Sequence, residues 1–102
     1  MANKPFVKKP GEKFKISIDF VNSLPTGASL STATISAIDD ESNNISNIVL
    51  NTTTGVISGT KVFVFLKDGT EGMRAHIKVK VFLDDNYTEL EENLLMKINE
   101  ES

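Results

Sequence analysis

The stretch Phe14–Phe20, FKISIDF, decides the fold class, because apolar and polar residues alternate in it without a break. Side chains of a β-strand point to opposite faces of the sheet at every second residue. The apolar side chains of the stretch therefore share one dry face, and the polar ones between them meet water. The dry face consists of Phe14, Ile16, Ile18 and Phe20. The stretch predicts a half-buried β-strand, which begins after the turn-forming segment Lys9–Glu12.

The composition predicts one globular domain over residues 1–102. A chain of 102 residues has the commonest size of a domain and buries enough surface to fold without a metal or a crosslink. Its 39% hydrophobic and 25% charged residues are ordinary for a soluble protein. The chain has no cysteine, which excludes disulfides and thiolate metal sites.

Charge and hydropathy argue against two classes of partner. The formal net charge is -3, whereas nucleic-acid binding normally needs a positive surface, so we expect no nucleic-acid partner. A net charge does not exclude a local basic stripe on the surface. No run of 18 apolar residues occurs, so we expect no membrane span. The first ten residues lack an apolar core, so we expect no signal peptide and synthesis in a cytoplasm.

Further strands follow the first one. Leu30–Asp39 alternates, with small residues on its inner side, and Thr60–Leu66 is β-branched and aromatic throughout. Ile45–Leu50 is a shorter strand candidate. Lys4–Lys8 suits an edge strand, because it contains one proline and another follows it. The side chains expected to face inward here are Ala33, Ile35, Ala37, Val62, Val64 and Leu66.

The last third predicts a β-hairpin. Arg74–Leu83 alternates strictly, Asp84–Asn86 supplies turn residues, and a second strand runs from Tyr87 to Asn99. The side chains expected to face inward in the first of these strands are Ala75, Ile77, Val79, Val81 and Leu83. Glu89–Met96 is also rich in helix formers, so a short terminal helix is the alternative. In the hairpin, the basic residues of the first strand would lie opposite acidic residues of the second. The basic set is Arg74, Lys78 and Lys80, and the acidic set is Glu89, Glu91 and Glu92.

About seven short strands, separated by turns and without a long helical period, predict an all-β fold. The spacing matches an antiparallel β-sandwich of two sheets.

The sequence predicts no catalytic, cofactor-binding or metal site. The single histidine, His76, lies among outward-facing lysines, and we assign it no role. Asp39–Glu41 and Asp84–Asn86 gather oxygen ligands of the kind that calcium takes, but neither has the ligand spacing of an EF-hand. Polar turns have the same composition. We therefore expect a protein that is not an enzyme and takes no small-molecule substrate.

Several large apolar side chains are expected to point away from the core. If Val62, Val64 and Leu66 enter it, Phe63 and Phe65 face outward. These residues lie either under a loop or at the sheet margin, or they form a protein interface. The candidate interface consists of Phe63, Phe65, Phe82 and Leu95.

Three motifs resemble a known group of proteins. Lys9–Glu12 leads into Ile18–Phe20, Leu24–Gly27 forms a turn, and Asp68–Gly72 precedes an alternating strand. Together they resemble the small immunoglobulin-like proteins encoded among the structural genes of tailed bacteriophages and prophages. The resemblance implies an immunoglobulin-like β-sandwich and a non-enzymatic virion structural protein of the head, neck or tail. Its partners would be other virion proteins or further copies of itself.

A second resemblance is local. Asn51–Thr60, NTTTGVISGT, is similar to a segment of bacterial cell-surface immunoglobulin-like repeats. It implies the alternative function, a module of a surface protein or adhesin that binds a protein or a glycan. The chain contains no tandem repeat and no predicted export signal, which favours the phage interpretation.

Overall fold

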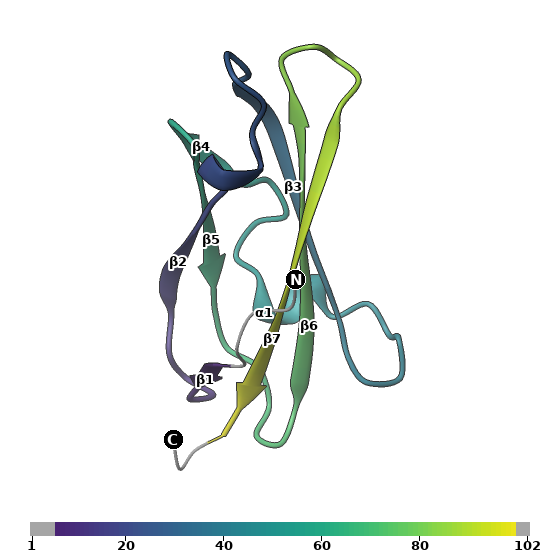
Figure 1. Ribbon diagram of the computed structural model, residues 1–102. Coiled ribbons are helices and arrows are strands. Elements are labelled where there is room, and N and C mark those ends of the chain that lie inside the picture. The colour runs from purple at the N-terminus through teal and green to yellow at the C-terminus, as the bar shows by residue number, and fades with distance from the viewer. Residues whose placement is uncertain (1–5, 100–102) are drawn as a thin grey trace.

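The computed structural model describes residues 6–99 as a sandwich of two β-sheets (Figure 1). Seven strands and two short helices lie within these residues. The strands are β1 (Phe6–Lys8), β2 (Phe14–Asp19), β3 (Leu30–Ile38), β4 (Val56–Ser58), β5 (Lys61–Leu66), β6 (Arg74–Leu83) and β7 (Glu89–Ile98). The helices are the 3-10 turn η1 (Val21–Ser23) and α1 (Ser46–Val49). The sandwich is elongated, with extents of 43 × 23 × 23 Å.

The strand order is that of an immunoglobulin-like sandwich. The larger sheet has the order β1-β7-β6-β3, and the smaller sheet has the order β2-β5-β4. The final hairpin thus pairs with β3, while β2, β5 and β4 form the opposite layer, as in the seven-stranded immunoglobulin pattern. All pairs are antiparallel except β1 with β7, which is parallel. β1 lies at the edge of the larger sheet. The predicted fold is confirmed.

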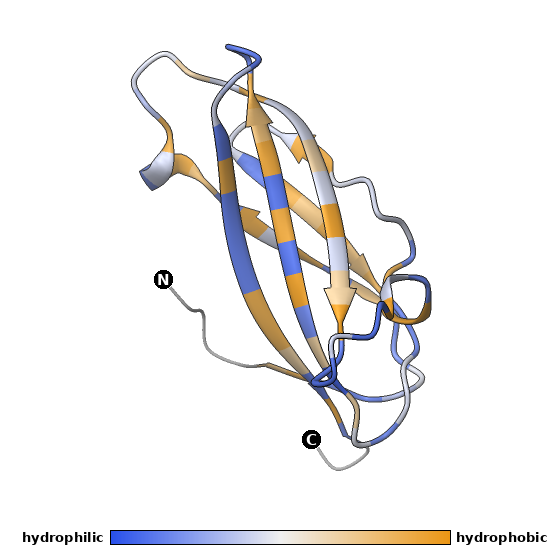
Figure 2. Ribbon diagram, turned by 90° about the vertical axis from the view of Figure 1, so that its right-hand side faces the viewer, coloured by the Kyte–Doolittle hydropathy of each residue, from blue (hydrophilic) through white to orange (hydrophobic). Residues whose placement is uncertain are grey.

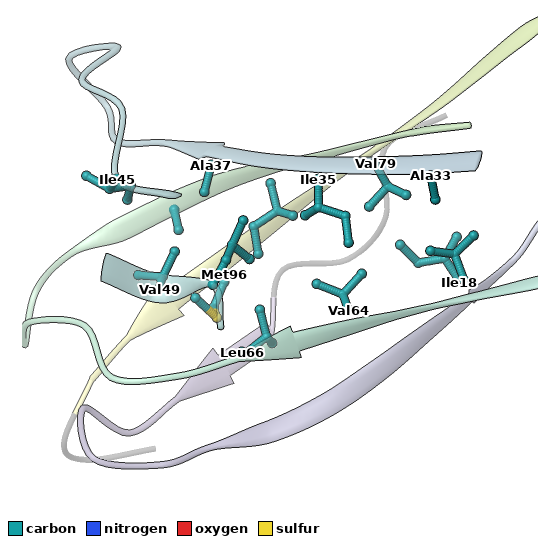
Figure 3. Packing of buried hydrophobic residues seen from close by; sticks show 14 of the residues in the cluster. Ile18, Ala33, Ile35, Ala37, Ile45, Val49, Val64, Leu66, Val79 and Met96 are labelled. Atoms are coloured by element: carbon teal, nitrogen blue, oxygen red, sulfur yellow. The ribbon is translucent and has the colours of Figure 1, made fainter. Parts of the chain in front are cut away.

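The core fills the space between the two layers (Figure 3). Val62 and Val64 of β5 are fully buried, and Val64 points toward Ile35 of β3 and Val79 of β6. Every inward residue predicted for β3, β5 and β6 is buried, and so are Met96 and Ile98 of β7. Phe14 and Ile16 are only half-buried, because β2 is an edge strand. Figure 2 shows the resulting bands of polar and apolar residues along the strands.

The hairpin forms as predicted, and the helix alternative for its second strand is wrong. The predicted charge pairs are only partly right. Lys80 lies opposite Glu91, but Arg74 lies opposite Lys97, and Glu89 opposite Phe82. Glu92 follows Glu91 directly, so it belongs to the other face of β7 and lies opposite Val79.

The segment Ile45–Leu50 is not a strand. Four of its residues form α1, because the preceding loop supplies a local hydrogen-bond partner: Asn44 Oδ1 accepts the Ser46 N–H at 2.9 Å. Ser46 Oγ in turn accepts the Ala37 N–H at 2.9 Å and ties the turn to β3. Ile45 and Val49 both enter the core, as residues four apart on one helical face do.

After α1 the chain covers the outer edge of β3. Gly55 N–H donates to Ala33 O at 3.0 Å, and Ile35 N–H donates to Thr53 O at 2.8 Å. The backbone approaches so closely that a Cβ on Gly55 would lie 2.7 Å from Val62 Cγ1 and 2.9 Å from Ala33 Cβ. Only glycine fits at this position without a shift of the core.

We predict that Gly55→Ala lowers the free energy of unfolding by about 1–3 kcal/mol, because it overpacks the core beside Val62. Gly11→Ala is the matched control, since nothing lies within 4 Å of a Cβ there. It should change the free energy by less than about 0.5 kcal/mol. Urea denaturation measures both, and equal effects of the two variants would contradict the close approach.

Lys8, the last residue of β1, is fully buried. Its Nζ donates hydrogen bonds to the backbone carbonyls of Lys9, at 3.0 Å, and of Asp68. Burial lowers the pKa of this amine from 10.5, and the negative charges of Asp68 and Glu12 oppose the shift.

This lowered pKa predicts a pH dependence of stability. Between the folded pKa and 10.5 the unfolded chain holds more protons at Lys8 than the folded chain does. The contribution of Lys8 to the free energy of unfolding therefore rises with pH across that window. Relative to Lys8→Met, the unchanged protein should gain unfolding free energy as the pH approaches 10.5, measured by urea denaturation. The exposed Lys97→Met serves as the control, and parallel pH curves for the unchanged chain and Lys8→Met would refute the prediction.

Candidate interaction surface

Phe63 and Phe65 lie on the outer face of the smaller sheet, where both are partly exposed. Their direction follows from β5, whose alternate residues fill the core. Phe63 is flanked across the strands by Ser17 and by Val56, which is 49% exposed. The Nζ of Lys15 lies 5.0 Å from the centre of the Phe63 ring, a cation–π distance. We call this surface the Phe63/Phe65 face.

Phe82 and Leu95 lie on the opposite side of the sandwich, on the outer face of the larger sheet. Phe82 is 38% exposed between Thr32 and Glu89, and Leu95 is half-buried beside His76. Along the β6–β7 ladder two polar cross-strand pairs separate them. The structure therefore brings together the first two candidate residues and keeps the other two apart from them.

A groove lined by lysines and asparagines as well as by Phe65 adjoins the Phe63/Phe65 face, and it was not predicted. One hollow of about 380 Å³ is lined by Lys13, Lys15, Phe65 and Lys67, among others. A second hollow, of about 610 Å³, lies over α1 and shares Asn51 and Lys67 with the first. The alternation of Lys13 and Lys15 with core-facing residues already indicates an outward direction for these two lysines. Asn51 gives no such signal, because its place depends on the path of the chain after α1.

The two acidic segments organise their own loops. Asp39 Oδ1 accepts the N–H groups of Asn43 and Glu41, each at 2.9 Å. Asp85 Oδ1 accepts those of Tyr87, at 2.9 Å, and Thr88, at 2.8 Å. The hydrogen bond from the Asn43 N–H to Asp39, and that from the Thr88 side chain to Asp85, contribute most to lowering the pKa of each carboxyl. Within residues 6–99, no three His, Asp or Glu side chains are grouped so that they could hold a metal ion.

His76 is part of a structural contact. Its Nε2 lies 2.7 Å from Asp40 Oδ1, and Arg74 Nε lies 3.7 Å from the other oxygen of the same carboxylate. All three side chains are about half exposed. The contact ties the loop after β3 to the start of β6.

The fold and its surfaces can now be compared with known proteins. The profile of a family described as podophage GP4 fiber-tail adaptor protein gp77 matches residues 8–97. The chain belongs to this family. The match runs from the end of β1 to the penultimate residue of β7 and thus covers both sheets. Comparisons with curated proteins and with solved structures found no match.

Membership of the gp77 family confirms the predicted phage structural protein. The family description names the phage tail and its fibre. In the described part of this family member, neither helix has the length and apolar character needed to cross a membrane.

A pair of opposite charges on the larger sheet of this gp77 family member tests the register of β6 against β7. Lys80 lies opposite Glu91, and the Nζ of the neighbouring Lys78 is 3.9 Å from a Glu91 oxygen. We predict that Lys80→Glu lowers the free energy of unfolding by roughly 0.2–1 kcal/mol, because like charges then face each other.

Lys97→Glu is the control of opposite sign. Lys97 lies opposite Arg74, so this change removes a pair of like charges and should leave stability equal or higher. Chemical denaturation compares the two, and a loss of stability in both variants would contradict the assigned register.

Proposed function

We propose that this chain is a non-enzymatic virion structural protein that joins two neighbouring proteins of a phage tail, with contacts on both sides of its sandwich. The carrying observation is the position of the four candidate residues. Phe63 and Phe65 lie on the outer face of one sheet, and Phe82 and Leu95 lie on the outer face of the other. The family description, a fibre–tail adaptor, supports this proposal.

An adaptor needs at least two binding surfaces, and a rigid sandwich separates two such surfaces at a constant distance. Aromatic side chains are enriched in the centres of protein interfaces, where they are shielded from water. Phe63 with its neighbour Val56 offers such a centre on the smaller sheet, and Phe82 offers one on the larger sheet. The two docked proteins would then lie on opposite sides of this chain.

His76 and the acidic residues Asp39 and Asp85 all have structural partners, which supports a non-enzymatic role. His76 is bonded to Asp40, and the carboxylates of Asp39 and Asp85 are bonded to their own loops. We propose that residues 1–102 act as one module, made in the bacterial cytoplasm and built into the virion. Its mechanism is surface complementarity.

The test replaces each pair of candidate residues separately in the phage gene. Phe63→Thr with Phe65→Thr, and Phe82→Thr with Leu95→Thr, remove one surface each and leave the core residues unchanged. Circular dichroism and thermal unfolding show that each variant folds. Purified particles are then examined for this chain and for tail fibres by gel analysis and electron microscopy.

We expect each double variant to fold and to be lost from particles, or to be retained without fibres. Tyr87→Thr is the matched control, because Tyr87 is 87% exposed at the β6–β7 turn and belongs to neither pair. It should assemble normally. Particles of wild-type composition from both double variants would overturn the proposal.

A further inference from the structure

The groove beside the Phe63/Phe65 face has a chemistry that specifies its occupant. We propose that it binds an extended acidic segment of a neighbouring virion protein, with one large apolar side chain of that segment inserted beside Phe65. This inference rests on the proposed function and names the partner of one of its two surfaces. We call the two adjoining hollows the basic groove; it contains Lys13, Lys15, Asn51, Phe65 and Lys67.

Three backbone segments form the floor of the basic groove. Lys15 of β2 lies opposite Phe65 of β5. On the other side of β5, Asn51 N–H donates to Phe65 O at 2.9 Å, and Lys67 N–H donates to Val49 O at 2.8 Å. The chain leaving α1 thus pairs with the end of β5, on the same side of β5 as β4. Lys15, Phe65 and Asn51 therefore stand in one row across a surface held by backbone hydrogen bonds.

The charge of the basic groove is opposite to that of the whole chain. The formal net charge is -3, yet three lysines and no carboxylate are among the described residues that line the two hollows. In the described part of the chain no ion pair connects Lys13, Lys15 or Lys67 to an acidic side chain. The like charges repel one another, and an anionic partner relieves that repulsion. Charge complementarity therefore selects an acidic segment.

The apolar part of the basic groove selects a peptide carrying an apolar anchor. Phe14, Phe65 and the aliphatic stems of the lysines line the hollow of about 380 Å³. This volume is in the range of sites that enclose a small ligand, so it has room for one large side chain. Asn44, Asn47 and Asn51 line the adjoining hollow, and their amides can donate to and accept from an extended backbone.

The same features argue against a nucleic acid as the occupant. Single-stranded nucleic acids are bound by several aromatic platforms on which successive bases stack, along a strongly positive channel. Here the described lining of the two hollows offers two rings, Phe14 and Phe65, both only partly exposed, and Phe14 also packs against the core. Three lysines on an acidic chain make a short contact rather than a channel.

The test uses the whole protein, labelled with ¹⁵N, and a short synthetic peptide of Asp and Glu with one central Phe. We expect the amide resonances of Lys15, Asn51, Phe65 and Lys67 to shift on titration. Binding should weaken as salt is added, because exposed charges are screened over about 8 Å at physiological ionic strength. Replacing the Phe of the peptide by Ala should weaken binding further.

The variant pair Lys15→Glu with Lys67→Glu should weaken peptide binding about tenfold or more, through the reversed charge. Lys97→Glu makes the same change of charge on the far sheet and should bind as the unchanged protein does. Equal binding by both variants, or shifts confined to residues outside the basic groove, would overturn the inference. A thymidine oligonucleotide that binds as tightly as the acidic peptide would also overturn it. The same holds if light scattering shows a dimer of the unchanged protein that Lys15→Glu with Lys67→Glu abolishes.

The same variants in particles separate this inference from the proposed function. Suppose that Lys15→Glu with Lys67→Glu assembles normally while Phe63→Thr with Phe65→Thr does not. The Phe63/Phe65 face then docks a partner, but the proposal that the partner binds through an acidic segment is wrong. If both variants assemble with fibres in place, the contact proposed for this side of the sandwich fails as well.

Discussion

The packing of β5 against β3 and β6 is the constraint on which the other features of the structure depend. Val62 and Val64 are fully buried between the layers, and Val64 faces Ile35 and Val79. Small and β-branched side chains fill this space, so the two sheets approach closely and even Gly55 has no room for a Cβ. Because β5 commits these side chains to the core, its intervening phenylalanines have to face the other way. The Phe63/Phe65 face is thus a consequence of core packing.

That consequence connects the fold to a role in assembly. A sandwich with two rigid outer faces can hold two proteins at a constant separation, and the gp77 family is described by such a joining role. Each outer face carries apolar residues within a polar surround: Phe63 beside Ser17 on one sheet, Phe82 beside Glu89 on the other. If the chain docks as we propose, the apolar centres supply the contact area and the polar surroundings form the rim of each interface.

The failures of prediction have two different physical causes. Ile45–Leu50 has strand-forming residues, but Asn44 and Ser46 form hydrogen bonds that favour a turn of helix, and β3 accepts that turn. Glu92 was assigned to the outer charge ladder, although its neighbour Glu91 already occupies that face. In the first case hydrogen bonds to the preceding loop and to β3 outweighed a strand-forming pattern. In the second, the alternation of β7 itself excludes Glu92 from the face that carries Glu91. The burial of Lys8 could not be predicted either, because the carbonyl of Asp68 that accepts its hydrogen bond lies 60 positions away.

The sequence by itself determined the all-β class, the inward and outward sets of β3, β5 and β6, and the outward direction of Phe63 and Phe65. It could do so because strand alternation is a property of neighbouring residues and needs no knowledge of what they pack against. Only the tertiary structure decided that the four candidate residues divide between two opposite faces, and that Asn51 and Lys67 meet Lys15 in one groove. These arrangements depend on which strands pair and where the chain crosses between sheets, and periodicity along the chain carries no record of either.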